Sequence, residues 1–292
     1  MEITPLGLGS WAMSGLGWEH AWGVTDDSQS IATIRRAVEL GVNWIDTAPV
    51  YGHGHSEEVV GRAVRELPEA DRPYVFTKCG LDWSSQDAMA PARKTMSGLA
   101  AQVDASLTRL GAERIDLLQV HWPPDEPLEE YWQQMLDLRA SGKIRAAGVS
   151  NFDVHQLAAA EKLGHVDSLQ PPLSLLRPDA ADDVIPWCAA HDTGVIVYSP
   201  LESGLLTDLL PEQLPPDDWR AADSEFAARR EQARPILARL RPVAARHGVP
   251  VAAIAVAWTL TRPGVTGAIV GARRPEQIDG WLAAGELPLE EM

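Results

Sequence analysis

The chain has 292 residues, of which 45% are hydrophobic, enough to bury a full core. Its 41 acidic and 25 basic residues give a formal net charge of −16, which argues against nucleic acid as a partner. Cys79 and Cys188 are too few for a disulfide framework and lack metal-ligand spacing. Neither a signal peptide nor an apolar run of membrane-spanning length is recognisable. We therefore expect a cytoplasmic protein, a monomer or weak oligomer, with no metal site and no membrane or nucleic-acid partner.

Strand-like and helix-like segments alternate along the chain. Short apolar runs predict strands over residues 6–11, 42–45, 74–77, 115–120, 144–149, 168–170, 195–198 and 266–270. Apolar spacing and capping residues predict helices over residues 26–40, 56–67, 92–110, 128–140, 154–163, 182–191, 224–246, 251–260 and 275–284. Residues 201–223 are irregular and longer than an ordinary connection, so we expect a functional segment there.

This alternation, with strands that are nearly continuous apolar runs, favours a parallel sheet. The competing doubly wound open sheet normally carries a glycine-rich fingerprint that opens a helix after the first strand. Here Gly7-Leu8-Gly9-Ser10 is followed by no helix and by no third glycine in register. We therefore predict a single (β/α)8 barrel of the TIM type, spanning residues 1–292.

Four titratable residues lie at or just beyond the ends of three successive predicted strands. They are Asp46, Tyr51, Lys78 and His121. Each has an ordinary alternative: a turn cap, a surface aromatic, a solvated lysine and a structural histidine. The carboxyl ends of barrel strands share one face, where such enzymes place their active sites. The joint occurrence of the four therefore favours a catalytic site.

This set resembles the catalytic tetrad of the aldo-keto reductases, which reduce carbonyl compounds with NAD(P)H. The resemblance spans about Leu6 to Ala284 and implies reduction of aldehydes or ketones to alcohols. In such a site Tyr51 donates a proton to the carbonyl oxygen and His121 donates a hydrogen bond to it. The Lys78 ammonium is expected to lower the pKa of Tyr51, and Asp46 to hold Lys78 in place.

The resemblance also implies a nicotinamide cofactor site on the later strands. Ser150, Asn151 and Gln170 would hold the carboxamide, Tyr198 would stack on the nicotinamide ring, and the segment with Ser199, Leu201, Gly204 and Leu205 would cover the pyrophosphate. Gly271, Arg273, Arg274 and Gln277 open a helix, a place that favours phosphate. The arginines can pair with a 2′-phosphate. We therefore expect NADPH, with Arg273 as the main contact, although NADH is possible because Gln277 replaces an arginine common in relatives.

Tryptophans in loops on the same face are candidates for the substrate pocket: Trp18, Trp22, Trp83 and Trp122. Loop anchoring is the alternative for the first two. Adenine contacts stay open, since Gly280 and Trp281 depart from the pattern. Two other functions also stay open: a non-catalytic NADP(H)-binding regulatory subunit, and an isomerase or aldolase that uses Lys78 as a Schiff base.

Overall fold

Parallel strands close into a barrel in the computed structural model of the chain, which describes residues 1–83, 87 and 89–288. The strands, in order around the barrel, are β1 (Leu6–Gly9), β10 (Gly267–Gly271), β9 (Gly194–Val197), β8 (Ser168–Gln170), β7 (Ile144–Ser150), β6 (Ile115–Val120), β3 (Tyr74–Cys79) and β2 (Trp44–Asp46). Because β1 pairs with both β10 and β2, this sheet has no free edge. The predicted (β/α)8 barrel is confirmed.

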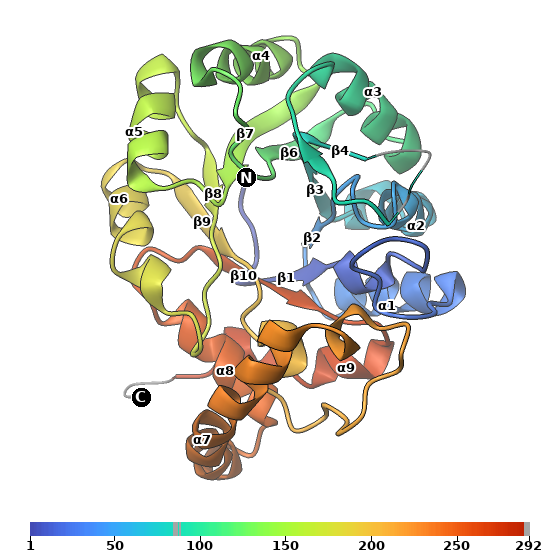
Figure 1. Ribbon diagram of the computed structural model, residues 1–292, viewed down its shortest axis with the longest axis vertical. Coiled ribbons are helices and arrows are strands. Elements are labelled where there is room, and N and C mark those ends of the chain that lie inside the picture. Colours follow the sequence, from blue (N-terminus) through green and yellow to red (C-terminus); the bar gives the residue numbers. More distant parts are fainter. Residues whose placement is uncertain (84–86, 88, 289–292) are drawn as a thin grey trace.

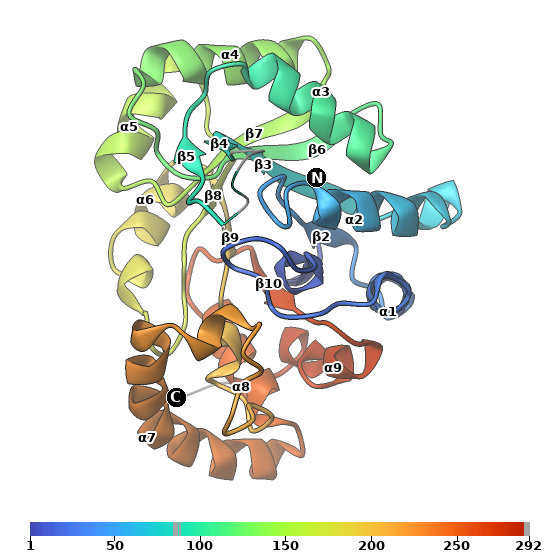
Figure 2. The ribbon, with the colours of Figure 1, turned by 45° about the vertical axis from the view of Figure 1, so that its right-hand side comes forward.

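Helices form a ring around the barrel (Figures 1 and 2). They are α1 (Asp27–Glu39), α2 (His55–Arg65), α3 (Leu99–Leu110), α4 (Leu128–Ala140), α5 (Val154–Leu163), α6 (Val184–Ala190), α7 (Ser224–His247), α8 (Val251–Leu260) and α9 (Pro275–Asp279). Capping residues in the sequence determine where several of these helices begin. Asp26 caps α1 through the amide of Ser28, and Asp153 forms a capping box with Gln156 at α5.

The helix expected over residues 92–110 was predicted too long. It begins at Leu99, because Gly98 lies at φ 70°, outside helical geometry. Upstream of it, β5 (Arg93–Lys94) pairs antiparallel with β4 (Leu81–Asp82) and forms a small hairpin after β3.

Other elements also differ from the prediction at their ends, and two of these differences have a clear local cause. The strand expected over residues 6–11 ends at Gly9, because Trp11–Met13 form a 3-10 turn. The helix expected over residues 275–284 ends at Asp279. Buried Trp281, at φ −134°, leaves helical geometry, and the segment continues as a 3-10 turn, Leu282–Gly285.

The barrel interior is built in layers, because successive side chains of a strand point to opposite faces. Apolar residues of six strands fill the amino-terminal part of the interior: Trp44, Phe76, Leu117, Ala146, Ile196 and Ile269. Gly7 makes room for this floor, since a Cβ at Gly7 would overlap the indole of Trp44. Ile3 packs against the floor, and Figure 1 places the N-terminus over the centre of the barrel. Two residues further along their strands, Asp46, Lys78 and Gln119 form a polar layer above the floor.

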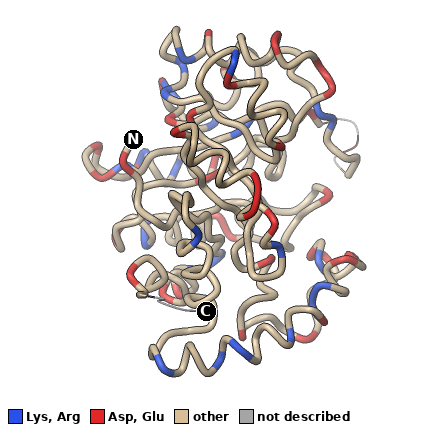
Figure 3. Tube along the Cα trace, turned by 90° about the vertical axis from the view of Figure 1, so that its left-hand side faces the viewer, with Lys and Arg blue, Asp and Glu red and all other residues tan. Residues whose placement is uncertain are grey.

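Charged residues of both signs are interspersed over the outside of the protein (Figure 3). Ion pairs join neighbouring helices: Arg62 of α2 lies 2.7 Å from Asp27 of α1, and Arg109 of α3 lies 2.7 Å from Glu57 of α2, which is buried. Among the described residues, no single helix has the length and apolar character to cross a bilayer; α7 and α8 meet those criteria only as a pair, bent by 96°.

Candidate active site

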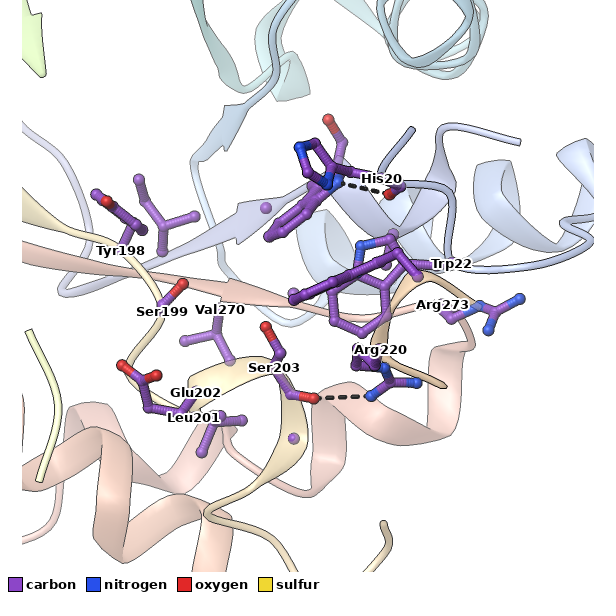
Figure 4. Close-up of a pocket in the computed structure, with 18 of the residues that line it drawn as sticks. His20, Trp22, Tyr198, Ser199, Leu201, Glu202, Ser203, Arg220, Val270 and Arg273 are labelled. Atoms are coloured by element: carbon purple, nitrogen blue, oxygen red, sulfur yellow. Dashed lines mark hydrogen bonds between the residues drawn. The ribbon is translucent and has the colours of Figure 1, made fainter. Parts of the chain in front are cut away.

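A pocket of about 1220 Å³ opens at the carboxyl ends of the barrel strands. It is larger than the roughly 300–1,000 Å³ typical of sites for drug-sized ligands, so an extended ligand and a small molecule can fit together. Figure 4 shows Tyr198 and Ser199 on one side of it and Trp22, Arg220 and Arg273 on the other. All four predicted catalytic positions are at this pocket: Asp46, Tyr51 and His121 line it, and Lys78 lies just beneath.

Lys78 forms a buried ion pair with Asp46. Its Nζ lies 2.5 Å from Asp46 Oδ1 and 2.9 Å from the carbonyl oxygen of Thr47. The third donor direction reaches the hydroxyl of Tyr51 at 3.5 Å. The two charged side chains are only 1% and 4% exposed, so both charges are held away from water and depend on one another.

Tyr51 is positioned by a tight turn after β2. Its amide donates to the carbonyl of Ala48 at 3.1 Å, and its carbonyl accepts from Ser56 at 3.2 Å. The next residue, Gly52, has φ 62°, and a Cβ there would overlap the carbonyl of Ser14, so the turn needs glycine. The ring of His121, which follows β6, meets Tyr51 edge-on with centroids 5.9 Å apart.

Burial keeps both of these side chains uncharged near neutral pH. It raises the pKa of Tyr51 well above the ordinary value, and the negative charge of Asp46 adds to the effect. It also lowers the pKa of His121 well below the ordinary value, with a further contribution from Lys78. The expected lowering of the Tyr51 pKa by Lys78 does not dominate, because burial of the phenol has the largest effect and Lys78 lies closer to Asp46 than to the phenol oxygen. The site therefore presents a protonated phenol beside a neutral imidazole.

Gln170 at the end of β8 turns its amide nitrogen into the barrel interior. Its Nε2 donates to Asp46 Oδ2 at 2.9 Å and to Gln119 Oε1 at 2.8 Å. Both protons of the NH2 group are thereby used, and Gln170 Oε1 is the part of this amide that can still accept a hydrogen bond.

Asn151 and Ser150 have their donors occupied as well. Asn151 Nδ2 donates to the carbonyl of His121 and to Ser150 Oγ, each at 3.0 Å. Ser150 Oγ donates to the carbonyl of Gln170 at 2.8 Å, and Tyr198 Oη donates to Asn151 Oδ1 at 2.8 Å. These side chains thus offer acceptors to the pocket and suit a ligand that brings N–H donors.

The remaining predicted cofactor positions are divided between pocket and core. Those that line the pocket are Tyr198, Ser199, Leu201, Gly204, Gly271, Arg273, Arg274 and Gln277. Leu205 is buried in a hydrophobic cluster with α7 and α8 instead. The side chain of Gln277 accepts from the amides of Arg273 and Arg274 at 2.6 and 3.1 Å, which stabilises the turn before α9.

Residues 199–223, which we call the strap, are tied to the loop after β1. Trp219 donates its amide proton to the carbonyl of Ala21 at 2.9 Å. The guanidinium of Arg220 lies 4.3 Å from the centre of the Trp22 ring, pairs with Asp218 at 2.6 Å, and donates to the carbonyl of Ser203 at 2.7 Å (Figure 4). The strap thus spans the pocket and is joined to its opposite rim.

Three of the four predicted pocket tryptophans line the pocket: Trp18, Trp22 and Trp122. Trp83 is set back behind His53, on whose ring it stacks with centroids 5.3 Å apart.

Sequence reasoning missed two aromatic residues, Trp11 and Trp219. The ring of Trp11 lies between Tyr51, at 6.2 Å, and Trp219, at 5.5 Å, and is nearly parallel to both. Trp11 follows β1 closely, so the rule that located the other strand-end residues could have found it. Trp219 lies in the strap, where no periodic pattern marks a position.

Comparison with known proteins decides the family. A sequence model described as "Aldo/keto reductase family" matches residues 5–292. The chain belongs to the aldo/keto reductase family. It is accordingly an oxidoreductase, as its relatives' names also indicate.

Among curated relatives of this aldo-keto reductase, YhdN of Bacillus subtilis is 37% identical, with 98% of this chain and 88% of that protein covered. The NADH-specific methylglyoxal reductase of Escherichia coli is 33% identical, with coverage of 100% and 92%. Among solved structures, a glycerol dehydrogenase from Gluconobacter oxydans has a TM-score of 0.85 and 37% identity, with coverage of 95% and 85%. An aldo-keto reductase from Klebsiella pneumoniae, solved with NADPH, has a TM-score of 0.74 and 28% identity, with coverage of 98% and 87%.

Removing the anion of the buried pair should destabilise the protein strongly. We expect Asp46→Asn to lower the free energy of unfolding by about 3–5 kcal/mol, because it leaves the Lys78 ammonium buried without a counter-charge. The matched control is Asp104→Asn, which removes the anion of the Lys143–Asp104 pair; this pair has the same 2.5 Å length, but its side chains are 41% (Lys143) and 57% (Asp104) exposed. That change should cost less than about 1 kcal/mol. Equal losses in urea denaturation would contradict this account of the pair.

Proposed function

We propose that this aldo-keto reductase reduces aldehydes or ketones to alcohols, with NADPH as hydride donor and Tyr51 as general acid. The observation that carries the proposal is the Tyr51 hydroxyl, in a pocket, with Lys78 Nζ 3.5 Å from its oxygen and the His121 ring edge-on to the phenol. Hydride addition places negative charge on the carbonyl oxygen, and that oxygen needs a proton and a hydrogen-bond donor. Tyr51 supplies the proton and His121 the hydrogen bond.

The residues present fit a nicotinamide dinucleotide. The acceptor groups of Ser150, Asn151 and Gln170 suit the NH2 group of a carboxamide. The start of α9, with Arg273 and Arg274, suits phosphate. When bound, NAD(P)H would supply the hydride that adds to the carbonyl carbon. One relative is named as NADH-specific and another was solved with NADPH, so the cofactor preference of this protein depends on its own residues.

For the 2′-phosphate of NADPH, we propose Arg274 as the main partner in place of Arg273. Arg273 already donates from Nη2 to the carbonyl of Val24 at 2.7 Å, close to the carboxylates of Asp217 and Asp218. Arg274 is exposed and, among the described residues, its guanidinium has no hydrogen bond or ion pair. A free guanidinium can meet a phosphate with paired, charge-assisted hydrogen bonds.

The aromatic walls favour a compact carbonyl substrate with apolar surface. Trp11, Trp18 and Trp122 line the pocket that also contains Tyr51 and His121. The Escherichia coli relative is named for methylglyoxal, a compound of this size class. From the composition and charge we further propose a monomer or weak oligomer that acts in the cytoplasm, without nucleic-acid or membrane partners.

The function is tested by assaying a panel of carbonyl compounds, with turnover followed by the absorbance of the reduced nicotinamide. The mechanism is tested with Tyr51→Phe. We expect the variant to lose at least about 100-fold in kcat, because the proton donor is gone. Its affinity for NADPH should stay nearly unchanged. Retention of more than about a hundredth of the wild-type kcat would exclude Tyr51 as the acid. Absence of any turnover in the wild type would instead favour a non-catalytic cofactor-binding subunit.

The cofactor assignment is tested by replacing each arginine alone. Arg274→Ala should raise the Kd for NADPH by about tenfold or more and leave that for NADH unchanged, since one charge-assisted contact is lost. Arg273→Ala should weaken both cofactors alike, because it releases the loop at Val24. If Arg273→Ala instead removes the preference for NADPH, our choice of arginine is wrong. Equal affinity of the wild type for both cofactors would show that neither arginine binds the extra phosphate.

A further inference from the structure

The side chain of Gln119 is completely buried in the barrel interior, next to the reacting groups. It lies on β6, two residues before His121. Its Oε1 accepts from Gln170 Nε2 at 2.8 Å, and its Nε2 reaches the carbonyl oxygen of Val149 at 3.5 Å. The amide therefore connects the backbone of β7 to the cofactor side of the site.

The two ends of this connection fix the direction of both amides. An amide side chain has one end that donates and one that accepts. The carbonyl of Val149 can only accept, so the NH2 group of Gln119 must face it and Oε1 must face Gln170. The carboxylate of Asp46, paired with Lys78, also accepts, so it too requires the NH2 group of Gln170, at 2.9 Å. With both protons of Gln170 Nε2 used inside the barrel, its Oε1 is the atom left for the pocket.

We propose that Gln119 is a positioning residue that holds Gln170 with its oxygen toward the pocket, so that the site selects a ligand bearing a primary carboxamide. The inference rests on the proposed function, since that ligand is the nicotinamide cofactor. Without Gln119 Oε1, one proton of Gln170 Nε2 is buried without a partner. The hydrogen bond to Asp46 is then the only one of the two that still holds the Gln170 amide, and the position of the acceptor that meets the carboxamide NH2 is less well defined.

The test compares two ligands that differ at the carboxamide. The 3-acetylpyridine analogue of NADP+ has a methyl ketone there and cannot donate a hydrogen bond. Titration followed by calorimetry should show that the wild type binds NADP+ about tenfold more tightly than this analogue, the factor expected for one hydrogen bond. In Gln119→Leu this ratio should fall clearly below that of the wild type, mainly because NADP+ binds more weakly. A merely structural defect would weaken both ligands and preserve their ratio.

Ser168→Ala is the matched control. Ser168 is buried on β8, two residues before Gln170, and its hydroxyl has no hydrogen-bond partner among the described residues. Its removal should keep the tenfold ratio. If circular dichroism shows that Gln119→Leu does not fold, Gln119→Met, which preserves the length of the side chain, replaces it in the test.

The ratio of the affinities for NADP+ and its 3-acetylpyridine analogue decides whether the inference holds. If a folded Gln119 variant keeps the wild-type ratio, or if the wild type does not distinguish the ligands, the inference is overturned while carbonyl reduction still supports the proposed function. If the wild type binds neither ligand, both the inference and the proposed function fail.

Discussion

The buried ion pair of Lys78 and Asp46 is the interaction on which the rest of the site depends. The ammonium directs its donors to Asp46 at 2.5 Å, to the carbonyl of Thr47 at 2.9 Å and to Tyr51 at 3.5 Å. The second oxygen of Asp46 accepts from Gln170 at 2.9 Å. Charges in a dry interior are stable only when such partners surround them. The pair therefore fixes the proton donor on one side and the proposed carboxamide site on the other.

The layer beneath the pair explains why it is so well defined. An apolar floor that includes Trp44 closes the barrel below the polar layer, so the polar side chains can satisfy their hydrogen bonds only with one another or with the backbone. Burial has the largest effect on the pKa values of the neighbouring groups, and the charges of Asp46 and Lys78 add to it. It keeps Tyr51 protonated and His121 neutral, the forms required for donation to a carbonyl oxygen.

The barrel could be predicted from sequence because apolar spacing marks nearly every one of its strands and helices. The four catalytic candidates followed from the rule that the carboxyl ends of barrel strands share one face. What could not be predicted arises from contacts between distant segments. The hydrogen bond of Gln119 to Gln170, the place of Trp219 beside Trp11, and the commitment of Arg273 to Val24 each join residues more than fifty positions apart. The pKa of Tyr51 could not be predicted either. It depends on how deeply the phenol is buried and how far it lies from Asp46 and Lys78, and no local sequence pattern gives these.

The charges of Lys78 and Asp46 act on the protonation of Tyr51 in addition to its burial, and the pH dependence of alcohol oxidation tests this central claim most directly. Oxidation needs the phenolate, so its rate should rise with pH and level off above the pKa of Tyr51. Lys78→Met removes the cation and leaves the Asp46 charge, which raises that pKa further. The account predicts that the midpoint of the kcat profile moves to higher pH in Lys78→Met, in addition to slower turnover. An unchanged midpoint would contradict it.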